Sequence, residues 1–250
     1  MIDSQARIND LITYLRQMRL PVMADHLRDL YTDKSFHQRT TLDILEILIN
    51  EEYQSRRYHT IQRNIKNAQL TQVTARLENI DYSESRQLNP ELFEQLSTCQ
   101  FIENHRNIII QGATGTGKSF IANALCLNAI ESGYTAYYIR MIELLSEMYL
   151  AELENQLPKL YKKLSKVDVL VIDDFLLTST TESEQKYLME VFELRNRDKM
   201  IILASQMSTA EWHKKLGSGA IADAILDRAI NNSYHIFVSG DSMRRDSSKN

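Results

Sequence analysis

The stretch that decides the fold is NIIIQGATGTGKS, residues 107–119. A short apolar run ends at Gly112, and the pattern Gly-x-x-x-x-Gly-Lys-Ser closes at Ser119. Glycines let the backbone wrap closely, so successive N–H groups can point at one anion. A helix that starts near Gly117 adds the positive end of its dipole. A plain flexible turn is the alternative, but the strand before and the helix after favour a phosphate-binding loop.

In such a loop, Lys118 would reach the β- and γ-phosphates of a nucleotide and Ser119 would hold Mg²⁺. A dinucleotide-binding fingerprint does not fit, because Phe120 stands where that pattern needs its third glycine. We therefore expect ATP and Mg²⁺ as cofactors. The predicted nucleotide-binding set is the whole loop: Gly112, Ala113, Thr114, Gly115, Thr116, Gly117, Lys118 and Ser119.

Two acidic residues, Asp173 and Asp174, follow a second apolar run at 167–172. A carboxylate at the carboxyl end of a strand beside the phosphate loop can hold Mg²⁺ through water, and Asp173 suits that role. Asp174 could orient and deprotonate the attacking water. A pair of turn aspartates is the alternative. With the phosphate loop upstream, the pair predicts a metal ligand and a catalytic base.

Two further candidates come later in the chain. The predicted strand 200–204 ends in Ser205 and Gln206, where a polar side chain could contact the γ-phosphate or the lytic water. The longer Gln206 is preferred. Arg228, expected to be exposed on a helix, could complete a neighbouring subunit's site as an arginine finger, or could form a surface salt bridge. Arg244 and Arg245 are a second candidate pair.

The pattern of elements predicts two parts. From residue 107, strands alternate with helices, which indicates a parallel sheet covered by helices on both faces. Residues 1–78 show apolar positions at helical spacing and no convincing strand. We expect a small all-helical N-terminal domain at 1–78, a connector at 79–106 and an α/β ATPase domain at 107–250. The expected strands are 107–111, 135–140, 167–172, 200–204 and 234–238.

The clearest basic stretch lies in the second half of a long predicted helix that starts near Thr41. It could bind nucleic-acid phosphates, or it could be a solvated helix face balanced by Glu51 and Glu52. The net charge of −4 does not indicate a nucleic-acid binder, although a local basic face is enough. The candidate DNA-binding residues are Arg56, Arg57, Arg63 and Lys66.

Cysteine use and the first residues bear on the compartment. Cys99 and Cys126 form no Cys-x-x-Cys pair and are typical of small core residues in a reducing compartment. The chain does not start with a basic segment followed by an apolar one, and its apolar runs are far too short for a membrane span. We expect a cytoplasmic protein with no membrane partner.

With these residues in place, the chain resembles the AAA+ ATPases. It most resembles the IstB family, ATPases encoded beside transposases in bacterial insertion sequences, whose relatives include helicase loaders of the DnaC type. The resemblance covers most of the chain, including the N-terminal helices around Leu20–Ala24. Gly112–Ser119 resembles Walker A. Val169–Asp174 resembles Walker B, with Asp173 in the magnesium position and Asp174 in the catalytic-acid position.

The resemblance continues toward the C-terminus. Ala204-Ser205-Gln206 resembles a sensor 1 strand end, Leu226-Asp227-Arg228 an arginine-finger helix, and Gly240–Arg245 a closing motif of the IstB family. There are two departures. Leu176 stands where a glycine is expected after Phe175. The chain stops soon after its last strand, so we expect no full C-terminal lid, and Arg244 or Arg245 would have to replace the sensor 2 arginine.

The resemblance implies an ATPase that assembles with ATP on duplex DNA as a ring or spiral homo-oligomer. It would recruit or activate the cognate transposase and help to select target sites, and hydrolysis would drive disassembly. One alternative is a replicative helicase loader of the DnaC type, acting with a hexameric helicase on single-stranded DNA. Another is a P-loop small-molecule kinase. A GTPase lacks support because no Asn-Lys-x-Asp motif is present, and the Asp173–Asp174 pair argues against a scaffold without turnover.

Overall fold

The computed structural model describes residues 4–33, 38–196 and 198–243. Contacts divide the chain into two compact units, Met1–Arg63 and Asn64–Asn250. The sequence predicts a boundary near residue 78 and a connector at 79–106, whereas this division falls between residues 63 and 64. The reason is local. Residues that the sequence assigns to the end of the N-terminal domain already bond within the second unit, as where the Thr71 N–H donates to Asn123 Oδ1 at 3.0 Å.

The first unit is built from α1 (Ser4–Gln17), α2 (Pro21–Thr32) and most of α3 (Thr41–Ala68). Its small core joins Ile12, Ala24, Leu27 and Leu48. Glu52 of α3 is buried, and one of its oxygens accepts the Met23 N–H at 3.0 Å. The carboxylate therefore caps the start of α2, where free N–H groups and the helix dipole favour a negative charge.

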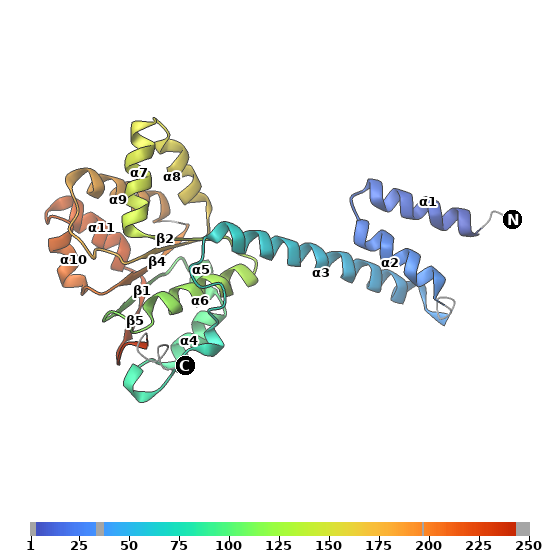
Figure 1. The fold of residues 1–250 in the computed structure, drawn as a ribbon, viewed down its shortest axis with the longest axis horizontal. Coiled ribbons are helices and arrows are strands. Elements are labelled where there is room, and N and C mark those ends of the chain that lie inside the picture. Colours follow the sequence, from blue (N-terminus) through green and yellow to red (C-terminus); the bar gives the residue numbers. More distant parts are fainter. Residues whose placement is uncertain (1–3, 34–37, 197, 244–250) are drawn as a thin grey trace. The chain divides into compact units, whose positions relative to one another are not determined.

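The second unit holds one five-stranded parallel sheet in the described residues, with strand order β2-β3-β4-β1-β5 (Figure 1). β4 lies between β1 and β3, and all three strands are parallel. Their carboxyl ends therefore lie side by side at the same end of the sheet. This arrangement brings the end of β1, the start of the phosphate loop, toward Asp173. The strands are β1 (Asn107–Gly112), β2 (Ala136–Arg140), β3 (Val169–Asp173), β4 (Met200–Ser205) and β5 (Ser233–Val238).

Helices cover both faces of this sheet, which confirms the predicted fold class. Side chains alternate along a strand. Ile109 of β1 joins the core cluster formed with the helices from α7 to α11, and its neighbours Ile108 and Ile110 point to the other face, where α6 lies. The helices are α6 (Lys118–Glu131), α7 (Met141–Leu153), α8 (Leu157–Lys166), α9 (Glu182–Arg195), α10 (Thr209–Lys215) and α11 (Ala220–Ile230).

The segment between α3 and β1 contains short elements that the sequence pattern only partly indicates. The predicted connector contains the helix α4 (Pro90–Ser97), which packs against α6. The 3₁₀ turns Leu77–Asn79 and Glu84–Arg86 and the short α5 (Gln100–Glu103) are not foreseen. No helix in the described ranges has the length and apolar character needed to cross a membrane.

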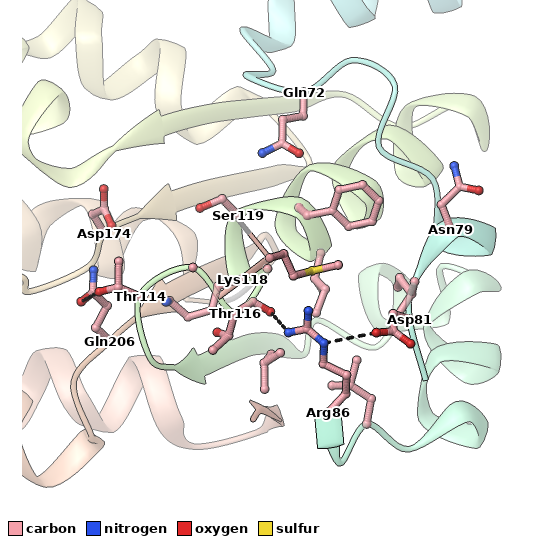
Figure 2. Close-up of a pocket in the computed structure, with 18 residues that line it drawn as sticks. Gln72, Asn79, Asp81, Arg86, Thr114, Thr116, Lys118, Ser119, Asp174 and Gln206 are labelled. Carbon is pink, nitrogen blue, oxygen red and sulfur yellow. Dashed lines mark hydrogen bonds and ion pairs between the residues drawn. The ribbon is translucent and has the colours of Figure 1, made fainter. Parts of the chain in front are cut away.

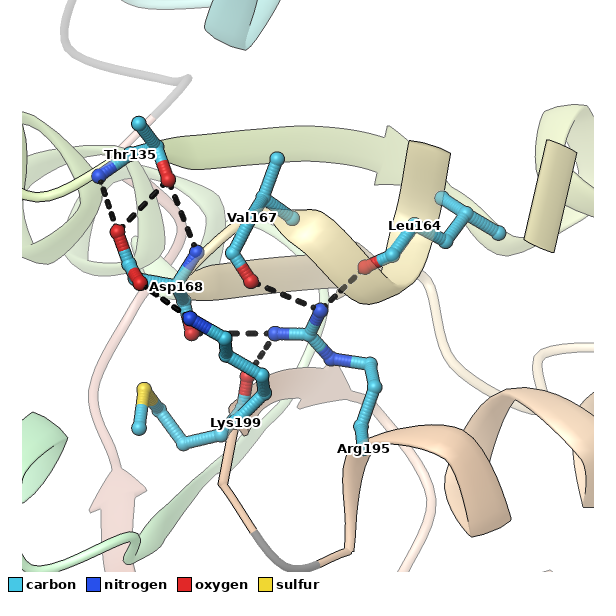
Figure 3. Close-up of polar contacts among 7 residues, drawn as sticks. Thr135, Leu164, Val167, Asp168, Arg195 and Lys199 are labelled. Carbon is cyan, nitrogen blue, oxygen red and sulfur yellow. Dashed lines mark hydrogen bonds and ion pairs between the residues drawn. The ribbon is translucent and has the colours of Figure 1, made fainter. Parts of the chain in front are cut away.

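A buried cation fastens the amino ends of β3 and β4 (Figure 3). The guanidinium of Arg195 is only 1% exposed and donates to the carbonyls of Val167, Asp168 and Met200 at 3.0, 3.1 and 2.7 Å, and also to that of Leu164. Burial lowers the pKa of this guanidinium to about 9. Four carbonyl partners replace the water that the buried donors lose. Arg195 therefore ties the ends of α8 and α9 to the sheet, on the side opposite the phosphate loop.

Candidate nucleotide site

The geometry of the phosphate loop requires its glycines. Gly115 and Gly117 have φ of +83° and +96°, a left-handed conformation that side chains with a Cβ rarely adopt. Gly112 is constrained by space instead, because a Cβ there would lie 2.3 Å from the Val238 carbonyl oxygen. The loop that joins β1 to α6 therefore has a conformation and a packing that depend on its glycines.

Lys118, the first residue of α6, lies inside the loop and not in solvent. It is 6% exposed, and its Nζ donates to the Ala113 carbonyl oxygen at 2.8 Å. The same carbonyl accepts the Thr116 hydroxyl at 2.9 Å. The ammonium is therefore held at the cradle, within the region where the phosphates of a bound nucleotide would lie.

A cavity of about 320 Å³ opens beside the loop (Figure 2), a size typical of small-molecule sites. The loop and Phe120 form one wall. The opposite wall comes from residues 72–88, a stretch without any chemical motif, and sequence reasoning missed it. Apolar Ile80 and Leu88 line that wall and suit the flat base of a nucleotide. Its polar members are Gln72, Asn79, Asp81 and Arg86.

The two acidic residues after β3 lie in different surroundings. Asp173 is 3% exposed; its carboxylate accepts the Tyr138 hydroxyl and, at 2.8 Å, the backbone N–H of Asp174. Burial, together with the neighbouring Asp173 carboxylate, raises the pKa of the Tyr138 hydroxyl. Asp174 lines the cavity instead and adopts a φ of +53°. The Asp173 carboxylate is therefore buried and held by hydrogen bonds, whereas Asp174 lines the cavity. No motif indicates the contribution of Tyr138.

Ser119 and Asp173 carry the hydroxyl and carboxylate oxygens that Mg²⁺ prefers, although Asp173 is not among the residues that line the cavity. Ser119 lines the cavity. The Asp173 carboxylate offers about four acceptor positions, of which Tyr138 and the Asp174 N–H take two, so acceptors remain for metal-bound water. Mg²⁺ usually needs only one or two carboxylates besides phosphates and water. Ser119 and Asp173 would hold the ion, which neutralises phosphate charge when bound.

The structure separates the two candidates at the end of β4. Ser205 is fully buried, and its hydroxyl donates to the Phe175 carbonyl at 2.7 Å and accepts the Trp212 indole N–H at 3.1 Å. Gln206 lines the cavity, and its Oε1 accepts the Thr114 hydroxyl at 2.6 Å. Gln206 is therefore the residue that is brought to the phosphate loop.

Arg228 lies far from this cavity. Its backbone carbonyl accepts the Asn107 side-chain N–H at 2.9 Å, at the amino end of β1, whereas the phosphate loop begins at the carboxyl end. The length of β1 separates the two ends by roughly 17 Å. The side chain is 21% exposed, less than the sequence suggests, because it forms an ion pair with Glu193 of α9. Arg228 cannot serve the nucleotide of its own subunit from this position.

The remaining candidates are placed as follows. Arg244 and Arg245 lie outside the described residues, which end at Met243. Arg57, Arg63 and Lys66 are exposed on α3, with Lys66 beyond the division between the units. Arg56 is also exposed but has structural partners: it donates to Glu52 at 2.7 Å and to the Arg19 carbonyl.

The departure at Leu176 has a structural counterpart. Its φ is +55°, the left-handed conformation that the expected glycine would adopt without strain. The side chain is nevertheless fully buried in the core shared with α7 and α9. The backbone path after Asp174 thus has the glycine-type conformation, and packing of the leucine offsets its strain.

Comparison with known proteins covers most of the chain. The family model for IstB-like ATP binding proteins matches residues 13–250. An insertion sequence ATP-binding protein of Sinorhizobium fredii is 31% identical over 231 residues, which cover 92% of this chain and 94% of that protein. An ATP-binding protein of insertion sequence IS21 from Pseudomonas aeruginosa is 24% identical over 237 residues, covering 95% and 89%.

Solved structures share the fold of the second unit. The DnaC helicase loader matches with 16% identity and a TM-score of 0.56, over 68% of this chain and 99% of that one. The replication initiator DnaA bound to AMPPCP and single-stranded DNA matches with 24% identity and a TM-score of 0.55, over 67% of this chain. The chain spans 50% of that initiator's length. The likeness is in the fold alone, a parallel sheet with helices on both faces.

Proposed function

Because this chain belongs to the IstB-like ATP-binding family, we propose that it is an ATP-dependent helper of a transposase. It assembles with ATP on duplex DNA as a ring or spiral homo-oligomer and recruits or activates the cognate transposase at the selected target. Hydrolysis of ATP drives disassembly. The family and its insertion-sequence relatives support a transposition-associated ATPase. We expect this activity in the cytoplasm, where DNA and ATP are found together.

The position of Arg228 is the observation that supports assembly into an oligomer. The cavity beside the phosphate loop has Lys118, Asp174 and Gln206 around it, and no cation from the end of α11. Arg228 lies at the opposite edge of the sheet, roughly 17 Å away by strand length. A head-to-tail contact between copies brings that edge of one subunit to the cavity of the next. The site is then completed only in the oligomer.

The residues of the site divide the work of hydrolysis. Lys118 binds the β- and γ-phosphates, and the loop N–H groups share their charge. Asp174, which faces the cavity, orients the attacking water and accepts its proton. Gln206, held by Thr114, contacts the γ-phosphate or the same water. Arg228 of the neighbouring subunit stabilises the charge that develops on the transferred phosphoryl group.

The first experiment is sedimentation and ATPase rate of the full chain with ATP, with and without long duplex DNA. Large assemblies that require both ATP and duplex, with an affinity that falls steeply with salt, support the proposal. Assembly on single-stranded DNA or with a hexameric helicase instead supports the loader function, for which the DnaC fold match is the supporting observation. Indifference to DNA with phosphate transfer to a metabolite would support the kinase.

Replacing Arg228 with alanine should leave ATP binding intact and stop turnover, because the missing cation acts on the next subunit. Mixing it with Asp174→Asn gives a complementation test. An Arg228→Ala subunit keeps its own Asp174, and an Asp174→Asn neighbour supplies the arginine. Random mixing in equal amounts should restore activity at about a quarter of the interfaces. Lys162→Ala, which removes an exposed positive charge on α8 of the same unit, is the control. A mixture as inactive as its components would place the finger elsewhere.

The basic stretch of α3 gives a separate prediction. Replacing Arg57 and Arg63 with glutamine should weaken duplex binding and lower the salt slope of log K by roughly two, about 0.9 for each phosphate that is no longer neutralised. Nucleotide binding should not change, because neither residue lines the cavity. Arg7→Gln with Arg28→Gln removes the same charge elsewhere in the first unit and controls for net charge. Equal DNA affinity and slope in the two double variants would make this stretch a solvated face.

A further inference from the structure

Three carbonyl oxygens of the phosphate loop accept hydrogen bonds from residues that follow the loop or lie elsewhere in the chain. The Ala113 carbonyl accepts Lys118 Nζ. The Gly115 carbonyl accepts the backbone N–H of Met243 at 3.0 Å. The Thr116 carbonyl accepts Nη1 of Arg86 at 2.7 Å, the contact drawn in Figure 2. Two of the three donors therefore come from segments far away in the sequence.

Holding a carbonyl also fixes the next N–H. The peptide unit is planar and trans, so the C=O of one residue and the N–H of the next point in opposite directions. Arg86 holds the Thr116 carbonyl toward residues 81–87, which are part of the cavity wall formed by residues 72–88. The Gly117 N–H consequently points the other way. Met243 holds the Gly115 carbonyl in the same way, and the Thr116 N–H of that peptide also donates to the Ala113 carbonyl at 3.4 Å. These are N–H groups that a phosphate cradle of this sequence uses.

Arg86 is built into this position and is not a surface residue that happens to lie nearby. It is 6% exposed, and its guanidinium also reaches the Ser239 carbonyl at 3.4 Å and the Asp81 carboxylate at 3.4 Å. Its own backbone carbonyl accepts the Ser239 N–H at 3.1 Å. One buried cation thus joins the segment before α4, the phosphate loop and the chain after β5.

Gly117 makes this support necessary. Glycine populates positive and negative φ about equally, so the 116–117 peptide has little intrinsic preference for one orientation. Its φ of +96° and the 2.7 Å bond from Arg86 are observed together at one peptide. A planar guanidinium with several donors can hold two carbonyls at once, which an ammonium on a flexible stem does less well.

We propose that Arg86 is a positioning residue for phosphate binding, which orients the Gly117 N–H toward the nucleotide by holding the Thr116 carbonyl. It acts through the loop and does not contact the phosphates. This inference deepens the proposed function, since it rests on the same nucleotide site, but it requires neither DNA nor assembly. Its ligand class is any nucleoside di- or triphosphate that the cavity accepts.

The test measures the affinity of the full chain for ATP, ADP and adenosine without DNA. Arg86→Gln should weaken the affinity for ATP and ADP about tenfold or more. The bond at stake is the one from the Gly117 N–H to a charged phosphate, and hydrogen bonds to charged groups are worth that much. Adenosine should bind as to the wild type, because it has no phosphates. Arg86→Lys keeps the buried charge, and its affinity for ATP and ADP should lie between those of the wild type and Arg86→Gln. Lys162→Gln, which removes an exposed positive charge on α8 of the same unit and away from the cavity, should bind all three ligands normally.

A second readout follows the peptide itself. In glycine-labelled protein, the Gly117 amide proton should shift strongly when ADP binds to the wild type, and that shift should shrink in Arg86→Lys and Arg86→Gln. If Arg86→Gln does not fold, Arg86→Lys decides on both measurements. Unchanged ATP affinity, or equal losses for adenosine and ATP, would overturn the inference. If the wild type binds ATP but ignores duplex DNA, the proposed function fails while this test still stands.

Discussion

Lys118→Ala is expected to abolish ATP binding and, with it, ATP-dependent assembly. The ammonium is 6% exposed and lies at the phosphate cradle, where it contacts Ala113. Truncating one partner of a buried, hydrogen-bonded charge pair costs about 2–5 kcal/mol, which corresponds to an affinity weaker by roughly 30-fold to a few thousand-fold. Titration with ATP, followed by sedimentation with ATP and duplex DNA, measures both effects.

The variant should remain folded. The Ala113 carbonyl that loses Lys118 still accepts the Thr116 hydroxyl at 2.9 Å, so this carbonyl keeps a partner. Thermal unfolding without nucleotide should therefore be close to that of the wild type. Lys159→Ala, a change of the same charge on the exposed side of α8, is the matched control. Normal ATP-dependent assembly of Lys118→Ala would refute the assignment of this loop as the phosphate site.

Asp174→Asn is expected to bind ATP and trap it. The amide keeps the size of the carboxylate but cannot accept a proton, and loss of a general base typically costs about 10²–10⁴ in rate. Asparagine also tolerates the left-handed conformation that Asp174 adopts at φ +53°, so the backbone should be retained. Single-turnover hydrolysis and nucleotide retention on DNA measure the two effects. Assemblies should form and then persist.

The neighbouring residue provides the contrast. Asp173→Asn changes the buried carboxylate bonded to Tyr138 and should weaken the magnesium dependence of ATP binding, an effect that Asp174→Asn should not show. If Asp174→Asn hydrolyses ATP at the wild-type rate, Asp174 is not the base. If both variants lose magnesium dependence equally, the division of roles between the two carboxylates is wrong.

Several features of this protein could be predicted from local sequence alone. The phosphate loop from Gly112 to Ser119 and the apolar runs are encoded by residues next to one another, since backbone preference and side-chain periodicity act over a few positions. The five strands accordingly lie within a few residues of their predicted ranges. The phosphate loop is readable because all of its groups come from one continuous stretch.

The tertiary structure alone decided which distant residues meet. Arg86 reaches the Thr116 carbonyl across 30 positions, and Tyr138 reaches Asp173 across 35. Neither contact has a local pattern, because each depends on strand order and on where a loop packs, which are set by burial of the whole sheet. The same holds for Arg228: its sequence suggests a finger, but only the order of strands shows that it lies at the edge opposite its own phosphate loop.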